Sequence, residues 1–316
     1  MQTAMTAPTR QPATAHSAHS AHSAHSAHSA DRAPLHCRVD GHSGEAIVCL
    51  HSSTGSQAQW RGLSGQLAER SRVFGFDLHG HGRSPQWPAG AGHTLLVDAG
   101  AVIERMRREP SVHLVGHSYG GAVALQIALR YPQWVRSLTL YEPVAFGLIH
   151  RHASGDDSLD EIEDIAQSVR LRVEQGDLDS ASERFVDYWA GAGAWRRLDP
   201  AQQAVVMSRV PTVPHHFDGC FAATWGHATL ARLQMPVLLM HGARTRAPAR
   251  RIVELLGDAL GTTLGDGVRR IAFEQAAHLG PNTHEREVNA AIVPFLREQL
   301  ARATDADDDS ELLLRA

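Results

Sequence analysis

A serine between two glycines is the feature of this 316-residue chain with the clearest chemistry. Ser118 lies between Gly116 and Gly120, after the strand-like run 112–115 and before the helix-like run 122–129. A sharp turn from strand to helix strains the backbone of its central residue, and glycines two positions away avoid the collisions that side chains would cause. The pattern therefore predicts that Ser118 is the nucleophile of a hydrolase.

With this motif the chain resembles the α/β-hydrolase superfamily over about residues 45–300. The resemblance implies a mostly parallel sheet flanked by helices, with an inserted helical cap. The expected organisation is a disordered His-Ser-Ala-rich tail at 1–33, an α/β-hydrolase core at 34–144 and 231–300, a helical cap at 145–230 and an acidic flexible tail at 301–316. Helical stretches are expected at 159–175 and 178–189, with turns around 191–193 and 211–214.

A loop rich in serine follows the apolar run 45–50 and resembles the His-Gly-x loop that carries the oxyanion hole in this superfamily. The resemblance implies that the backbone N–H groups of Ser53 and Tyr119 stabilise the negative oxygen of a tetrahedral intermediate. Ser52 stands where glycine is usual. An ordinary Ser/Gly turn is the alternative interpretation of the loop.

The general base of such an enzyme follows the last strand. His278 occupies this position, after the strand-like run 270–273 and before the helical stretch 285–300. In the superfamily the acid that orients this histidine usually follows the preceding strand, yet Thr245 stands there, and a threonine carries no charge to stabilise an imidazolium. Glu142 ends the strand-like run 136–141 and resembles the acid of branches that carry it one strand earlier. An ion-pair or capping role for Glu142 remains the alternative.

A serine nucleophile distinguishes the possible chemistries. Serine activated by histidine attacks a carbonyl carbon and forms an acyl-enzyme, whereas the relatives that open epoxides or displace halide use aspartate. Hydrolysis of a carboxylic ester or related acyl bond is the primary expectation. The alternatives are hydrolysis of a C–C bond in diketone-like substrates and a ligand-binding receptor that keeps the fold without turnover. The expected cap is rich in aromatic residues, which would suit an apolar pocket. They are Phe146, Tyr188, Trp189, Trp195, Phe217 and Trp225.

Composition excludes several other classes of function. Net charge is −4 with both signs mixed, which gives no basic footprint for nucleic acid. The chain contains no lysine, which excludes a Schiff-base lysine and a Walker-type phosphate lysine, and no cofactor motif is present. Cys37, Cys49 and Cys220 have no paired spacing, and no apolar run of membrane-spanning length occurs. We expect a cytoplasmic enzyme without cofactors that acts on a small-molecule acyl substrate.

Histidine clusters raise the question of metal binding. The repeat at 16–30 aligns five histidines along an extended chain, but its composition favours a disordered tail. His79 and His81 lie in the turn 77–84, which resembles the superfamily's D-x-x-G-x-G-x-S element, and His93 follows further along the chain. They lack the spacing of zinc ligands, so we predict no metal site.

Overall fold

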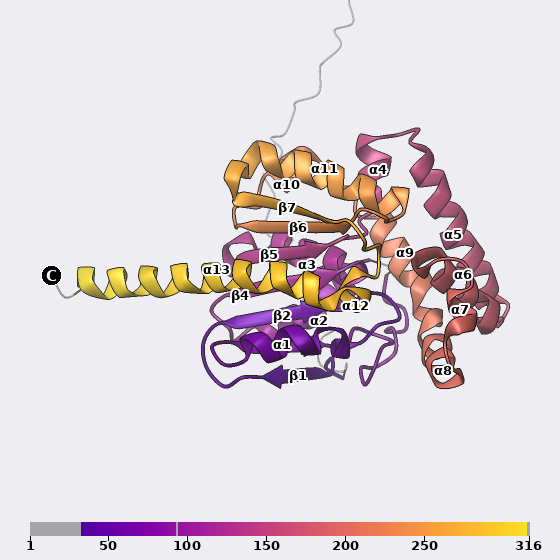
Figure 1. The fold of residues 1–316 in the computed structure, drawn as a ribbon, viewed down its shortest axis with the longest axis horizontal. Coiled ribbons are helices and arrows are strands. Elements are labelled where there is room, and N and C mark those ends of the chain that lie inside the picture. Colours follow the sequence, from indigo (N-terminus) through magenta and orange to yellow (C-terminus); the bar gives the residue numbers. More distant parts are fainter. Residues whose placement is uncertain (1–32, 93, 315–316) are drawn as a thin grey trace, which may run out of the picture. The chain divides into compact units, whose positions relative to one another are not determined.

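The computed structural model describes residues 33–92 and 94–314 of the protein (Figure 1). Within these residues one sheet has the strand order β1-β3-β2-β4-β5-β6-β7. Strand β1 runs antiparallel to β3, and all other neighbours are parallel, as the sequence predicts. The strands are β1 Cys37–Asp40, β2 Ala46–Leu50, β3 Arg72–Phe76, β4 Val112–His117, β5 Val135–Tyr141, β6 Val237–Gly242 and β7 Val268–Phe273.

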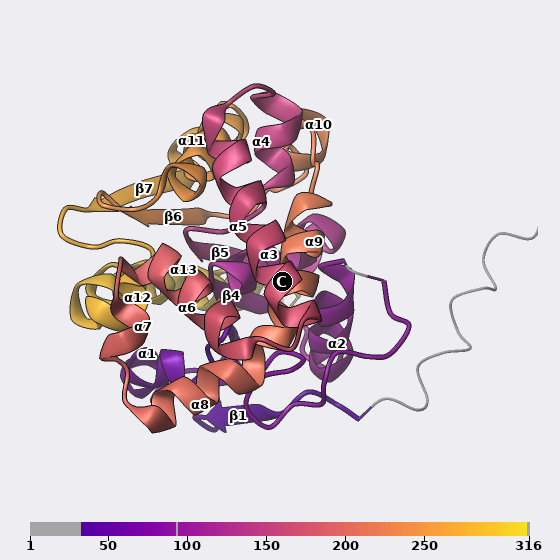
Figure 2. The same cartoon turned by 90° about the vertical axis from the view of Figure 1, so that its right-hand side faces the viewer.

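Helices cover both faces of the sheet (Figure 2). Every residue of β2 is buried, and alternate side chains point to opposite faces. Ala46, Val48 and Leu50 pack into one apolar cluster, while Ile47 and Cys49 pack into a second one. The first cluster includes side chains of α2 Leu96–Met106, α3 Tyr119–Arg130 and α11 Ala247–Leu264, and the second includes those of α1 Arg61–Leu67 and α13 Glu285–Leu314.

A long helical insertion separates β5 from β6. Its apolar side chains, including Ile162, Phe185 and Phe217, join the first apolar cluster. By its contacts, the part of the chain from residue 34 onward forms one compact unit. The division into core and cap therefore stays a proposal, based on the insertion of these helices between β5 and β6. The inserted helices are α4 Gly147–His152, α5 Asp157–Glu174, α6 Leu178–Ala190, α7 Ala194–Arg197, α8 Pro200–Arg209, α9 Val213–Phe221 and α10 His227–Leu230.

Two local expectations differ from the structure. The segment 211–214 is helical, not a turn, because Pro211 and Pro214 lie in the first turns of a 3-10 helix at Val210–Thr212 and of α9, where a missing N–H costs nothing. Helix α13 continues past the predicted boundary at residue 300 as far as Leu314. Residues 301–314 contain no glycine or proline that would end a helix. Residues 1–32 of the predicted tail at 1–33 lie outside the described residues.

The remaining short elements connect the larger ones. Helix α12 spans Gly280–Thr283, and the other 3-10 helices span Gln57–Trp60, Pro132–Trp134 and Gly265–Gly267. No helix in the described part of the chain is long and apolar enough to cross a membrane.

Candidate active site

Ser118 occupies a strained turn between β4 and α3. Its backbone has φ 54° and ψ −121°, in a region that residues other than glycine rarely adopt. Position 120 requires glycine, because a Cβ there would lie 2.5 Å from the carbonyl oxygens of Leu50 and His51. At Gly116 a Cβ would lie 2.5 Å from the carbonyl oxygen of Gly120. The two glycines thus allow the turn that brings Ser118 to the end of the sheet.

His278 and Glu142 follow two other strands, and His278 lies between Ser118 and Glu142. The Nε2 atom of His278 lies 2.9 Å from Ser118 Oγ, and Nδ1 lies 2.7 Å from Glu142 Oε2. A carboxylate can only accept, so Nδ1 carries the proton and Nε2 accepts the serine hydroxyl. All three side chains are buried, with exposed fractions of 5%, 2% and 0% for Ser118, His278 and Glu142. The structure therefore brings together the three residues that the sequence predicts to be catalytic.

Thr245 supports Glu142 from the position where the superfamily usually carries the acid. Glu142 directly follows β5 and has a positive φ of 42°. Its Oε1 accepts a hydrogen bond of 2.8 Å from the Gly242 N–H, and its Oε2 accepts one of 2.6 Å from the Thr245 hydroxyl. The last residue of β6 and the loop that follows it thus supply one donor each, and together they hold the carboxylate toward His278. The sequence ruled out Thr245 as the acid but gave no sign of this contact.

The two predicted oxyanion-hole residues line one cavity with Ser118. Tyr119 is the first residue of α3, and the N–H groups of a helix start have no partners within the helix. Ser53 lies in the loop after β2. The preceding Ser52 anchors this loop, because its N–H and its hydroxyl both donate to Gln59 Oε1, at 3.2 Å and 3.1 Å.

A second histidine, which the sequence analysis missed, holds the backbone of His278. His117 Nε2 donates to the carbonyl oxygen of His278 across 2.7 Å, and Gln59 Nε2 donates to His117 Nδ1 across 3.1 Å. Burial holds the pKa of His117 well below its usual range. Its place at the end of β4, next to Ser118, is the one sequence signal that could have indicated this role.

The cavity beside Ser118 is small and mostly apolar. Its volume is about 20 Å³, roughly the space of one water molecule. Of the cap aromatics named from sequence, Phe146, Trp189 and Phe217 line it. The Trp189 ring stacks on the His278 imidazole, with centroids 3.8 Å apart. The inserted helices therefore cover the serine and histidine directly.

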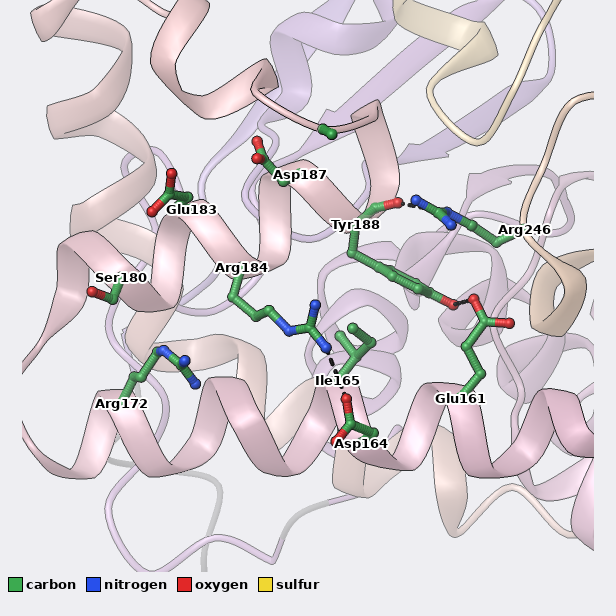
Figure 3. A pocket seen from close by; sticks show the side chains of 11 residues that line it. Glu161, Asp164, Ile165, Arg172, Ser180, Glu183, Arg184, Asp187, Tyr188 and Arg246 are labelled. Atoms are coloured by element: carbon green, nitrogen blue, oxygen red, sulfur yellow. Dashed lines mark hydrogen bonds and ion pairs between the residues drawn. The ribbon is translucent and has the colours of Figure 1, made fainter.

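A wider pocket is lined by side chains of α5 and α6 together with Arg246 (Figure 3). It has a volume of about 630 Å³ and is lined mostly by charged side chains of α5 and α6. Those side chains bond to one another: Arg184 to Asp164 at 2.8 Å, and the Tyr188 hydroxyl to Glu161 at 2.9 Å. Arg246 Nε donates to the Tyr188 carbonyl oxygen at 3.0 Å, which ties α6 to the loop after β6.

The histidines around the turn 77–84 form hydrogen bonds with the protein. His79 Nδ1 lies 2.7 Å from Asp98 Oδ1, and His81 Nδ1 lies 2.8 Å from the carbonyl oxygen of His79. Asp77 accepts from the Gln57 N–H at 2.8 Å, so it fixes the turn. No cluster of metal-binding side chains occurs in the part of the chain that the structure describes, which does not include His93.

Comparison with known proteins supplies the family. The family model described as alpha/beta hydrolase fold matches residues 45–280, which is more than half of the chain. The chain belongs to the α/β-hydrolase fold family. Solved structures agree: this α/β-hydrolase resembles a hydrolase from Pseudomonas aeruginosa PA01 with a TM-score of 0.64 and 24% identity, over 83% of this chain and 94% of that one. At that identity the likeness shows the fold.

Two curated relatives match a shorter part of this α/β-hydrolase. The dihydrolipoyllysine-residue acetyltransferase component of the acetoin cleaving system of Cupriavidus necator is 39% identical over 109 residues, 34% of this chain and 29% of that protein. Lipase LipV of Mycobacterium tuberculosis is 37% identical over 110 residues, 34% of this chain and 41% of that protein. The chain thus matches less than half the length of each.

Proposed function

We propose that this protein is a serine hydrolase that cleaves a carboxylic ester or a related acyl bond of a small molecule. The observation that carries the proposal is the unbroken hydrogen-bonded sequence from Ser118 Oγ through His278 to Glu142, with distances of 2.9 Å and 2.7 Å. A serine is a weak nucleophile until an adjacent base takes its proton, and this arrangement provides that base.

The reaction follows from the positions of these groups. His278 Nε2 takes the hydroxyl proton while Ser118 Oγ bonds to the carbonyl carbon, and the carbonyl oxygen becomes negative. The N–H groups of Ser53 and Tyr119 donate to that oxygen. His278 then gives the proton to the leaving alcohol as the C–O bond breaks, and water releases the acyl group by the same steps. Glu142 stabilises the imidazolium that forms each time.

The contact between Glu142 and His278 also weighs against a ligand-binding receptor without turnover. Such a receptor has no need for a buried carboxylate hydrogen-bonded to the ring nitrogen that faces away from the serine. The lipase among the relatives agrees with an acyl substrate. The apolar side chains that cover Ser118 further support the proposal, because such a cover would shield an acyl-enzyme from bulk water.

Labelling with a fluorophosphonate tests the proposal. The reagent phosphonylates an activated serine, so the intact mass of the protein should rise by one adduct, and Ser118→Ala should abolish both the adduct and the hydrolysis of p-nitrophenyl esters. The matched control is Ser208→Ala, on an exposed part of α8, which should label like the parent protein. A folded parent protein that takes up no reagent would contradict the proposal.

A further inference from the structure

His216 is a polar side chain in the otherwise mostly apolar cavity beside Ser118. It comes from α9 and is buried, with an exposed fraction of 2%. Its Nδ1 lies 2.8 Å from Ser53 Oγ, and its ring stacks on the Tyr119 ring with centroids 3.6 Å apart and planes 9° apart. His216 therefore contacts both residues whose N–H groups form the proposed oxyanion hole.

One nitrogen of His216 lacks a partner. Burial, together with neighbouring histidines, keeps its pKa well below the usual range, so the ring is neutral and carries one proton. If the Ser53 hydroxyl donates to Nδ1, the proton is on Nε2, and Nε2 has no hydrogen-bond partner among the described residues. The other tautomer leaves both the Ser53 hydroxyl proton and the Nε2 lone pair without partners. The first arrangement is therefore favoured, and it leaves a buried donor for a ligand to satisfy.

The proposed reaction defines where this donor meets a substrate. The leaving alcohol must lie at His278 Nε2, and the carbonyl oxygen must face the N–H groups of Ser53 and Tyr119. His216 contacts the side chains of those two residues and lines the same cavity as Ser118, so we place it on the carbonyl side of a bound substrate. In a 1,3-dicarbonyl compound whose two carbonyl groups point the same way, the β-carbonyl oxygen lies next to the ester carbonyl oxygen, on the acyl side of the ester bond.

Resting on the proposed function, we infer that the substrates are esters whose acyl group carries an oxygen on its β-carbon, and that His216 Nε2–H donates a hydrogen bond to that oxygen. His216 is then a specificity-determining residue that binds substrate without taking part in proton transfer. An acyl group without this oxygen leaves the buried N–H unsatisfied, which disfavours its binding.

Paired ethyl esters test the inference. Hydrolysis of ethyl 3-oxobutanoate and of ethyl butanoate is followed by pH-stat titration, and the ratio of their kcat/KM values is compared between variants, which cancels their different intrinsic reactivity. His216→Phe keeps an aromatic ring over Tyr119 but removes the donor, so the ratio should fall about tenfold, mainly through KM for the oxo ester. His216→Gln retains a donor at a similar reach and should keep most of the preference.

The matched control is His215→Phe, the same substitution one residue earlier on α9, where the ring stacks on Trp87 and does not line the cavity. It should leave the ratio unchanged. Labelling of Ser118 by fluorophosphonate in each variant shows that the protein is folded. An unchanged ratio in labelled His216→Phe, or a labelled parent protein that does not hydrolyse the oxo ester, overturns this inference alone. A folded parent protein that neither labels nor hydrolyses either ester overturns the proposed function as well.

Discussion

At the scale of single residues, the unusual feature is a glutamate that takes up a left-handed backbone conformation at the end of β5. Glu142 has no exposed surface and accepts from His278, Thr245 and the Gly242 N–H. A buried carboxylate is stable only when such donors satisfy it. The loop after β6, where the superfamily usually carries the acid, here supplies the Thr245 hydroxyl that donates to Glu142.

Glu142→Gln tests the role of the charge. A glutamine is nearly the same size, but it stabilises no imidazolium and can present an N–H group to Nδ1, which favours the wrong tautomer of His278. We expect kcat to fall by about 10⁴-fold. The rate of p-nitrophenyl ester hydrolysis measures the change, with Glu174→Gln at an exposed position of α5 as the control. Activity within tenfold of the parent protein, in a variant that unfolds at a normal temperature, would remove Glu142 from the proposed triad.

The sequence predicts the three residues of the proposed triad but not the contacts that support them. Ser118 was indicated by glycine spacing, His278 by its place after the last strand, and Glu142 by the lack of a carboxylate at Thr245. Parallel strands bring their carboxyl ends to one edge, which is why residues so far apart in sequence meet. The bonds from Thr245 to Glu142 and from His216 to Ser53 depend on side-chain orientation across 103 and 163 positions, and no local pattern encodes that.

At the scale of elements, β4 and α3 pack tightly against the end of β2. The close approach occurs at Gly120, where an added Cβ would meet two backbone oxygens at 2.5 Å. Backbone atoms cannot move aside as a flexible side chain does. The position of Ser118, the proposed nucleophile, therefore depends on the absence of a side chain at Gly120.

Gly120→Ala should destabilise the protein by at least about 2 kcal/mol, because the new methyl group forces α3 away from β2. Urea unfolding followed by circular dichroism gives the free energy of unfolding. Gly65→Ala is the matched control, since Gly65 lies within α1 and has no atom within 4 Å of an added Cβ. That variant should be more stable than the parent by about 0.5–1 kcal/mol. Equal stability of the two variants would contradict the tight packing at Gly120.

At the scale of the whole molecule, buried histidines make stability depend on pH. His51 Nε2 accepts from the Leu78 N–H at 3.0 Å, and His81 Nε2 accepts from the Thr54 N–H at 2.9 Å. A protonated ring could not accept either bond. Burial lowers the pKa of His51 to about 4 and that of His81 to about 3.

The direction of the pH effect follows from these pKa values. Histidine in the unfolded chain has a pKa of about 6.5, so between about pH 6.5 and pH 4 the unfolded state binds more protons than the folded state. The stability that these residues contribute is complete above about pH 6.5 and is lost as the pH falls through this window. Urea unfolding at pH 7.5, 6 and 5 should give steadily lower free energies of unfolding. His81→Gln should flatten the curve and exposed His42→Gln should not; parallel curves for these two variants would refute the assignment to His81.

The position of Glu142 also bears on how this chain could diverge. Ser118 and Glu142 both lie in the continuous segment 112–142, which holds β4, α3 and β5, and the long insertion begins only after them. Lengthening, shortening or exchanging the inserted helices leaves the spacing between Ser118 and Glu142 unchanged. Of the three proposed catalytic residues, only His278 follows the insertion in the sequence. Natural variation or directed recombination can therefore reshape substrate preference through the cap while two of the three proposed catalytic groups are inherited as a single block.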